Sequence, residues 1–294
     1  MQDKSLVTII CLCYNQEPYV IESLQSVINQ DYKLIELIIV DDCSTDHSKS
    51  VIEKWLLDYP EIQFIANETN LGSTKSFNKA LKIAKGAYII DLAADDVLRN
   101  NCVSLQCNAF TNSPFKNLGM VYGNAALINE NGDFDSYYFA VDHHKNVIQK
   151  RVTGDIYLSV ITGGNSICSV SSMAKKTVFD ALNGYDKNLA YEDLDFWIRS
   201  SRVYEVDFID KILINKRTVA NSLGTHFFKR RNKINNSTFI ILKKAIQLNR
   251  TNEENKAILK RIHFEMILAF RTSNFELVLR YIAMESKLRI KILF

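Results

Sequence analysis

Three short polar segments each follow a run of aliphatic residues in this 294-residue sequence. They are Tyr14-Asn15, Asp41-Asp42 and Asp95-Asp96. Two adjacent carboxylates repel each other unless a cation or hydrogen-bond donors compensate their charge. A divalent metal ion together with a donor-rich ligand would supply both kinds of compensation. These residue types therefore predict a site for a metal ion and a polar ligand.

The hydrophobic pattern of the first 130 residues predicts elements that would bring these segments together. Apolar runs typical of buried strands alternate with stretches whose apolar residues recur at helical spacing. The strand-like runs are 6–12, 34–40, 62–65 and 87–90, and the helical stretches are 20–28, 44–57 and 70–83. This alternation predicts a parallel sheet with helices on both faces. Ligands of such sheets bind at the carboxyl ends of the strands, where the three polar segments fall.

The pattern is looser beyond residue 130. Asn131-Gly132-Asp133 predicts a turn between two strands. The pattern also predicts a helix over 192–202, a strand over 206–214, and only helices after 225, with breaks near 249–252 and 272–274. We therefore predict an α/β domain over residues 1–224 and a basic helical extension over residues 225–294.

Charge is distributed unevenly between these two parts. Residues 1–224 contain 21 Lys and Arg against 28 Asp and Glu, a balance of −7, whereas residues 225–294 contain 15 against 5, a balance of +10. One explanation is that the helices of the extension pack on the first domain with solvated basic faces. The other is peripheral contact with a membrane surface or an anionic acceptor. Nucleic acid fits less well, because the first domain is acidic and no recognition motif is present.

Composition and motif searches exclude several classes. The chain is 47% hydrophobic and 23% charged, as in ordinary globular proteins, and no apolar run reaches the roughly 20 residues of a membrane span. The first residues lack a secretory signal pattern, so we expect a cytoplasmic protein and buried, reduced cysteines. No Gly-rich phosphate loop is present. A bound diphosphate would therefore need a divalent metal held by carboxylates.

Five segments, in this order, resemble the inverting family 2 glycosyltransferases with the GT-A fold. They are 7–15, 38–46, 70–72, 94–96 and 191–197, and the resemblance covers residues 5 to about 220. It implies a Rossmann-like, mostly parallel central sheet with a C-terminal helical extension. It also implies transfer of a sugar from a nucleotide-diphosphate donor, expected to be a UDP-sugar, to a hydroxyl of a glycan or lipid-linked acceptor in polysaccharide assembly.

The resemblance implies nucleotide-binding roles at several positions. Asp42, with Asp41 beside it, would accept hydrogen bonds from the base or ribose, and a uracil N–H would suit that acceptor. Lys75 would offset diphosphate charge, unless it is simply an exposed helix lysine. The full implied nucleotide-binding set is Tyr14, Asn15, Asp41, Asp42, Asn70, Gly72, Lys75, Asp95 and Arg217.

The resemblance also implies how the reaction is catalysed. Asp95 and Asp96 would hold Mn²⁺ or Mg²⁺ across the two phosphates. Asp193 would be the general base that takes the proton of the acceptor hydroxyl, and Glu192 would orient the acceptor or the base. Glu192 and Asp193 also suit the first turn of a helix, where carboxylates favour the macrodipole. Asp195 is expected to be structural.

The sequence departs from the pattern of this family at certain positions. Ala93 stands where many members have the first aspartate of the metal motif, and Val219 stands where many have a histidine, with His226 as a candidate replacement. The loop 163–166 resembles the acceptor-side loop, but no chemistry is assigned to it. A catalytically degenerate protein that binds sugar nucleotide or glycan therefore stays an alternative. A nucleotidyltransferase is a weaker one, because it would need a Gly-rich loop after the first strand.

Overall fold

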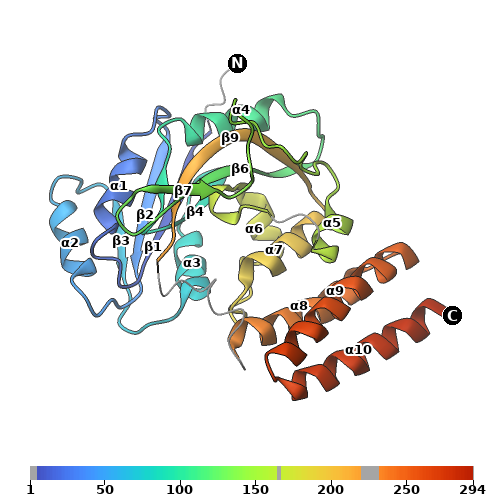
Figure 1. Cartoon of the computed structure of the whole chain (residues 1–294). Coiled ribbons are helices and arrows are strands. Elements are labelled where there is room, and N and C mark those ends of the chain that lie inside the picture. The colour runs from blue at the N-terminus through green and yellow to red at the C-terminus, as the bar shows by residue number, and fades with distance from the viewer. Residues whose placement is uncertain (1–4, 164–166, 220–231, 294) are drawn as a thin grey trace. The chain divides into compact units, whose positions relative to one another are not determined.

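The computed structural model describes residues 5–163, 167–219 and 232–293 (Figure 1). The chain divides into two compact units. One contains the sheet, and the other contains α5 (Tyr157–Thr162), α7 (Glu192–Ser201), α8 (Lys233–Leu248), α9 (Asn252–Arg271) and α10 (Phe275–Leu293). Two helices that precede residue 224 thus group with the C-terminal helices. The boundary at 224 itself stays a prediction, since residues 220–231 lie outside the described ranges.

Four parallel strands form the first half of the sheet, in the order β3-β2-β1-β4. They are β1 (Val7–Cys13), β2 (Ile35–Asp41), β3 (Gln63–Ala66) and β4 (Tyr88–Ala93). The helices α1 (Val20–Ile28), α2 (Ser48–Trp55) and α3 (Ser73–Leu81) connect them. Every residue of β1 except the half-buried Leu12 is buried, as expected of a strand covered on both faces. The predicted α/β architecture is confirmed.

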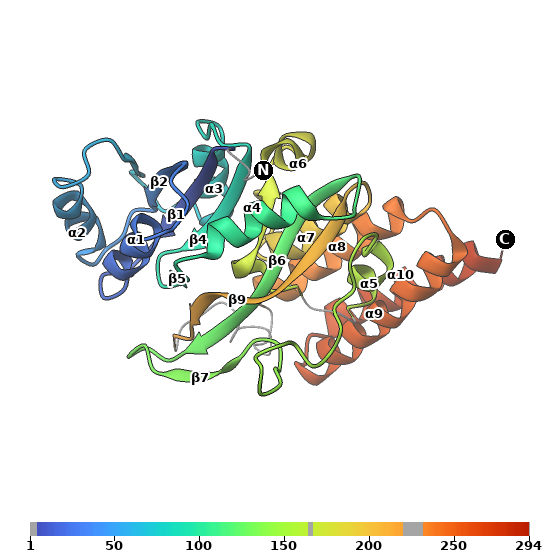
Figure 2. The same cartoon turned by 90° about the horizontal axis from the view of Figure 1, so that it is seen from above.

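The chain reverses its direction across the sheet after β3. It moves outward from β1 to β3 and then returns past β1 to β4. Crossovers between parallel strands are right-handed, so the reversal puts α1 and α2 on one face and α3 on the other, as Figure 2 shows. The result is a topological switch point between β1 and β4, the place where ligands bind in open α/β sheets.

The second half of the sheet mixes parallel and antiparallel pairing. It contains β5 (Val97–Leu98), β6 (Leu118–Ile128), β7 (Phe134–Tyr137), β8 (Met173–Lys175) and β9 (Glu205–Arg217), with α4 (Cys102–Asn112), α6 (Lys176–Leu182) and the 3₁₀ turn Ser169–Ser171. β8 is antiparallel to both β4 and β6, whereas β6 and β9 are parallel. The predicted turn joins β6 to β7, with Gly132 at φ 88°. β9 continues past its predicted end to Arg217.

The helices of the second unit break where the sequence predicts. α9 begins with a capping box, in which the Thr251 hydroxyl accepts from the Glu254 N–H at 3.1 Å and the Glu254 carboxylate accepts from the Thr251 N–H at 3.2 Å. α9 and α10 pack side by side (Figures 1 and 2). Among the described residues, no helix is both long and apolar enough to cross a bilayer.

The six cysteines are free thiols, of which Cys43 alone is partly exposed. Burial raises the pKa of Cys13 and of Cys168 to about 11. The prediction that the cysteines are mostly buried is confirmed, and their reduced state stays a prediction.

Candidate active site

Hydrogen bonds between strand ends bring the predicted polar segments to one edge of the sheet. The Asp42 N–H donates to the Cys13 carbonyl at 2.9 Å, and the Ala94 N–H donates to the Leu12 carbonyl at 3.0 Å. β1 therefore lies between the segment that holds Asp42 and the segment that leads to Asp95. The three segments meet at the switch point.

The end of β1 is tied to the loop after β2 through Asn15. Its N–H donates to Ser44 Oγ at 3.0 Å, and its Oδ1 accepts from the Thr45 N–H at 2.7 Å. Asn15 and Cys43 have φ of 55° and 61°, a left-handed conformation that is uncommon for non-glycine residues. Tyr14 remains 45% exposed and can present its ring to a ligand.

The Asp42 carboxylate organises the loop before α3. Its Oδ1 accepts from Asn67 Nδ2, Ser76 Oγ and the Leu71 N–H at 2.8–2.9 Å, and its Oδ2 accepts from the Gly72 N–H at 2.8 Å. Burial would raise the pKa of Asp42, but these hydrogen bonds outweigh it and lower the pKa. Gly72 has φ 85°, where a side chain would be strained. Asp42 thus fixes the backbone at Leu71 and Gly72, directly before α3.

Asp41, unlike Asp42, has a carboxylate oxygen that accepts no hydrogen bond from a described residue. Its side chain is buried, and its Oδ2 accepts from the Ser44 N–H at 3.1 Å. Its Oδ1 is also buried, and no described residue donates to it. A buried carboxylate oxygen without a donor is costly, which indicates a position that a ligand N–H or O–H completes.

The predicted residues at the start of α3 are solvent-facing. Asn70 is exposed in the loop that Asp42 holds, and Lys75 is exposed on the helix. No hydrogen bond or ion pair to a described residue restrains the Lys75 ammonium group. Both interpretations of Lys75 stay open.

Asp95 and Asp96 follow β4, and both are short of compensating positive charge. Burial, and after it the negative charge of Asp95, raise the pKa of Asp96 to about 7, and burial also raises the pKa of Asp95. The cations Arg217 and Lys216 act in the opposite direction without cancelling these effects. Two hard oxygen ligands lacking charge compensation fit a divalent cation that takes its other ligands from phosphate and water. Within the described residues no cluster of three or more His, Cys, Asp or Glu adds a further ligand.

Arg217 fixes the backbone that carries this aspartate pair. Its side chain is 4% exposed, and its own N–H donates to Asp96 Oδ1 at 2.8 Å. The guanidinium group donates to the carbonyls of Asp95, Asn129 and Glu130 at 3.1–3.2 Å and to Glu22 Oε2 at 2.6 Å, and it stacks on the Tyr19 ring. Five hydrogen bonds donated by Arg217 thus join β9 to α1, to the loop after β4 and to the β6–β7 turn.

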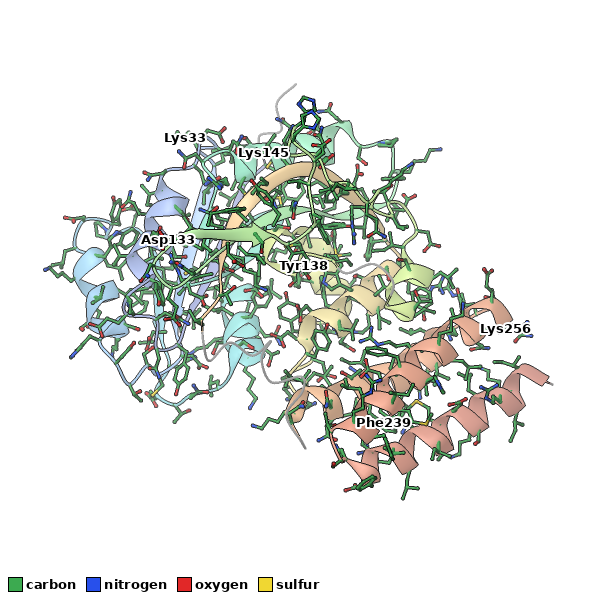
Figure 3. The ribbon with its side chains drawn as sticks, in the orientation of Figure 1. Lys33, Asp133, Tyr138, Lys145, Phe239 and Lys256 are labelled. Carbon is green, nitrogen blue, oxygen red and sulfur yellow. The ribbon has the colours of Figure 1, made fainter. Side chains whose placement is uncertain are left out.

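These contacts give Arg217 a role that sequence reasoning did not identify. Its guanidinium group is occupied by protein acceptors, so its assignment to the nucleotide stays a prediction. Glu22 was missed because it lies 195 positions from Arg217 and has no local motif. Lys216 was also missed; its ammonium group lies 5.7 Å from the Tyr138 ring centre (Tyr138 is labelled in Figure 3), and its charge lowers the pKa of both aspartates.

We expect Arg217→Met to lower the free energy of unfolding by about 3–5 kcal/mol, because it leaves three carbonyls and Glu22 without their donor. Glu22→Gln keeps an acceptor and removes a carboxylate that is 57% exposed, so a loss below about 1 kcal/mol is expected. Lys216→Met, at the neighbouring position on β9, is the matched control. Urea unfolding measures all three. Equal losses in Arg217→Met and Lys216→Met would contradict this structural role of Arg217.

The acidic segment that contains the predicted general base begins α7 in the second unit. Glu192 and Asp193 lie in its first turn and are half-buried. Asp195 is 1% exposed and forms ion pairs with Arg199 at 2.6 Å and Lys244 at 2.9 Å. These pairs account for Asp195 as a structural residue. Among the described residues, no hydrogen bond or ion pair occupies the Asp193 carboxylate.

Some residues singled out in the sequence cannot be placed in the site. His226 and loop residues 164–166 lie outside the described residues.

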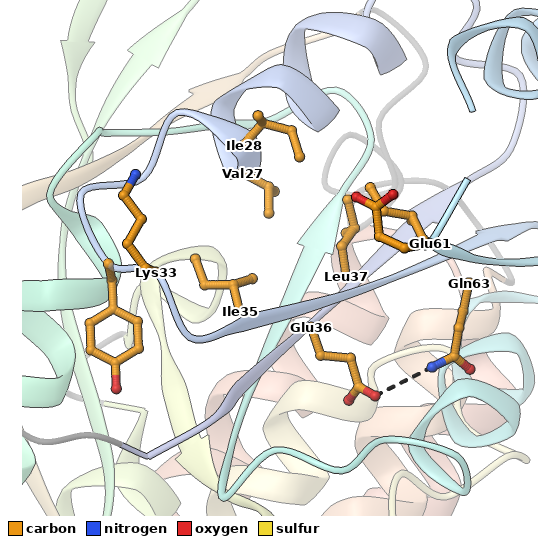
Figure 4. A pocket seen from close by; sticks show the side chains of 10 residues that line it. Val27, Ile28, Lys33, Ile35, Glu36, Leu37, Glu61 and Gln63 are labelled. Atoms are coloured by element: carbon orange, nitrogen blue, oxygen red, sulfur yellow. Dashed lines mark hydrogen bonds between the residues drawn. The ribbon is translucent and has the colours of Figure 1, made fainter. Parts of the chain in front are cut away.

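A hollow of roughly 240 Å³ lies at the amino end of β2, lined by residues that include Val27, Lys33, Glu36 and Gln63 (Figure 4). None of the predicted site residues lines it, and Asp41 lies at the opposite end of the same strand. We therefore assign the hollow no part in the reaction.

Comparison with known sequences finds one family and many relatives. The profile described as "Glycosyl transferase family 2" matches residues 8–174. An "uncharacterized glycosyltransferase" of Methanocaldococcus jannaschii is 30% identical over 218 residues, which are 73% of this chain and 71% of that protein. The chondroitin synthase of Escherichia coli is 26% identical over 212 residues, which are 72% of this chain and 29% of the synthase.

Solved structures share the fold at low identity. The S. aureus protein TarS (residues 1–349), crystallised with UDP-GlcNAc, has a TM-score of 0.65 and 17% identity over 87% of this chain and 71% of that chain. The mannosyltransferase PcManGT of Pyrobaculum calidifontis, crystallised with GDP-Man and Mn²⁺, has a TM-score of 0.62 and 15% identity over 97% and 76% of the two chains. The fold is therefore the GT-A type predicted from the sequence motifs.

Proposed function

This chain belongs to glycosyl transferase family 2 and is a glycosyltransferase, and we propose that it transfers a sugar from a UDP-sugar to a hydroxyl of a glycan or lipid-linked acceptor with inversion. One observation supports binding of the nucleotide-sugar donor. Four aspartates lie together at the switch point between β1 and β4: Asp41, Asp42, Asp95 and Asp96. A nucleotide base and a diphosphate need an acceptor-rich and a metal-binding region side by side.

For the donor, Asp41 Oδ1 is the proposed partner of the uracil N–H, because it is buried and no described residue donates to it. Tyr14 would flank the base, and Asn70 and Gly72 would line the wall that Asp42 holds in place. The TarS structure supports a uridine nucleotide, since it was crystallised with UDP-GlcNAc. Lys75 and Lys216 are the cations proposed for the diphosphate.

For the leaving group, Asp95 and Asp96 would hold Mn²⁺ or Mg²⁺. Bound there, the cation would act as a Lewis acid on the diphosphate oxygens. The raised pKa of Asp96 and the burial of its side chain support this assignment. So does the crystallisation of PcManGT with Mn²⁺. Arg217 would hold this pair in place, because it donates hydrogen bonds to the Asp95 carbonyl and to Asp96 Oδ1.

For the acceptor, Asp193 is the proposed base. It would take the proton of the acceptor hydroxyl while that oxygen forms a bond to the anomeric carbon of the sugar. The bond from the anomeric carbon to the diphosphate oxygen breaks on the opposite side, and the nucleoside diphosphate leaves. A single displacement of this kind inverts the anomeric configuration. Glu192 would orient the acceptor from the same helical turn.

Two observations support the proposed class of acceptor: the name of a relative and the charge of the C-terminal residues. The chondroitin synthase matched above assembles a polysaccharide by its name, which supports a glycan acceptor. The +10 balance of residues 225–294 supports an anionic, lipid-linked acceptor with peripheral membrane contact. The cytoplasmic location stays a prediction.

A donor panel tests the proposal. Purified protein with Mn²⁺ is incubated with UDP-, GDP- and TDP-sugars, with and without oligosaccharide acceptors, and nucleoside diphosphate release is measured. We expect turnover with at least one UDP-sugar. If UDP-sugars bind but no donor releases a nucleoside diphosphate, the catalytically degenerate binding protein would be favoured instead. The observation behind that alternative is Ala93, which stands where many family members have the first aspartate of the metal motif.

A further inference from the structure

The helix α10 is apolar on two opposite sides. Leu277, Tyr281 and Leu288 are 1–2% exposed and form its packed side. Phe275, Leu279, Ile282 and Ile290 are 47–68% exposed; we name these four residues the outer stripe. The two sets share helical spacing but are offset by two residues, about 200° around the helix. The outer stripe therefore lies opposite the packed side, and the described part of the chain leaves it uncovered.

The margins of the outer stripe are basic. Arg280, Lys287 and Lys291 follow one margin at helical spacing, and Arg289 lies on the other with Glu285 at 2.6 Å. The Arg280 guanidinium lies 4.2 Å from the centre of the ring of Phe239 in α8, the residue labelled in Figure 3. α10 carries four basic residues against two acidic ones.

The exposed apolar surface continues onto the preceding helix. Phe270, near the end of α9, is 62% exposed, and its ring contacts the Phe275 ring edge-on at 5.9 Å between centres. Phe264 and Ile267 of α9 are exposed as well. Lys260 and Arg271 are exposed on the same helix. Apolar side chains with basic neighbours thus extend over two helices.

We propose that the outer stripe docks on an anionic phospholipid surface. Its apolar side chains would enter the interface, and the basic margins would contact lipid phosphates, as in helices that lie in the plane of a membrane. A second copy fits less well, because a two-fold contact repeats the same surface on both sides and would bring Arg280 of one copy near Lys287 of the other. Membrane binding by the outer stripe does not depend on the proposed function. Only its purpose does, because binding would bring the enzyme to a lipid-linked acceptor.

Vesicle flotation of the full chain tests the proposal without needing turnover. The vesicles are phosphatidylcholine alone or mixed with phosphatidylglycerol, at low and high salt. We expect binding to the anionic vesicles that salt weakens. Each basic residue near such a surface is worth roughly fivefold in partitioning, so Lys287→Glu/Lys291→Glu should reduce binding at least about 25-fold. Leu279→Ser/Ile282→Ser should reduce it on the order of 10²-fold.

Matched variants in the first unit serve as controls. Lys116→Glu/Lys150→Glu makes the same charge change at exposed positions, and Leu57→Ser/Ile148→Ser removes apolar groups that are at least as exposed. Both should bind vesicles as the unaltered chain does. No flotation at low salt, or equal losses in the controls, would overturn the proposal. So would a dimer that Leu279→Ser/Ile282→Ser converts to monomer, or unfolding of that variant. Nucleoside diphosphate release, measured separately, reports on the proposed function.

Discussion

Asp193→Asn is expected to lower sugar transfer by roughly 10²–10⁴-fold while the chain still binds the sugar nucleotide. The substitution keeps the size of the side chain and removes its ability to take a proton. Asp193 lies in the first turn of α7, and no described residue forms a hydrogen bond or ion pair with its carboxylate. Transfer rates at saturating donor and acceptor, with donor binding by calorimetry, measure the two effects separately.

Asp195→Asn is the contrast within the same helix. Asp195 is buried between Arg199 and Lys244, so its loss should destabilise the chain by about 3 kcal/mol and leave transfer by the folded protein intact. If Asp193→Asn instead lost donor binding and kept its rate at saturation, Asp193 would belong to the nucleotide site and our assignment would be wrong. An unchanged rate in Asp193→Asn would remove it from the mechanism.

Asp95→Ala/Asp96→Ala should abolish measurable transfer, with a loss on the order of 10³-fold or more, because the leaving diphosphate would lose its cation. Exhaustive chelation of the unaltered chain should have the same effect, and added Mn²⁺ or Mg²⁺ should reverse it. Since removing Asp96 also removes a buried carboxyl with a raised pKa, the variant should not unfold. Nucleoside diphosphate release and a melting curve test both statements.

The control removes two exposed acidic residues far along the chain from the metal motif. Asp58→Ala/Glu61→Ala, in the connection between α2 and β3, should transfer at the unaltered rate. Transfer that survives chelation would refute the need for a divalent metal. A chelation-sensitive enzyme whose double aspartate variant keeps its rate would place the metal at other residues.

The elements and the edge that carries the site could be predicted from local pattern. The apolar runs that became β1, β2 and β3 lie within one residue of their predicted ranges, and β4 ends three residues beyond its predicted end. The breaks that separate α8, α9 and α10 fall where the sequence loses helical spacing. The carboxyl ends of parallel strands lie along one edge of the sheet. Once β1, β2 and β4 were identified as parallel strands, the segments that follow them were therefore expected at the same edge.

The division of the chain into units could not be predicted in the same way. Helices α5 and α7 group with α8 and α9 through contacts between residues far apart in sequence. Helical spacing shows that a helix has an apolar side, but not which other helix covers it. For the same reason the spacing of α10 did not reveal that no described residue covers one of its two apolar sides.

The sequence by itself determined the α/β class, the site edge and the chemical types of the residues there, because these follow from side-chain periodicity and from motifs within a few residues. Only the tertiary structure decided which hydrogen-bond partners each of these groups has. It showed that Asp42 is occupied by the loop before α3, that Asp41 keeps a buried oxygen without a described donor, and that Arg217 is held by Glu22. Hydrogen-bond partners are settled by distances between segments remote in sequence, which no local pattern encodes.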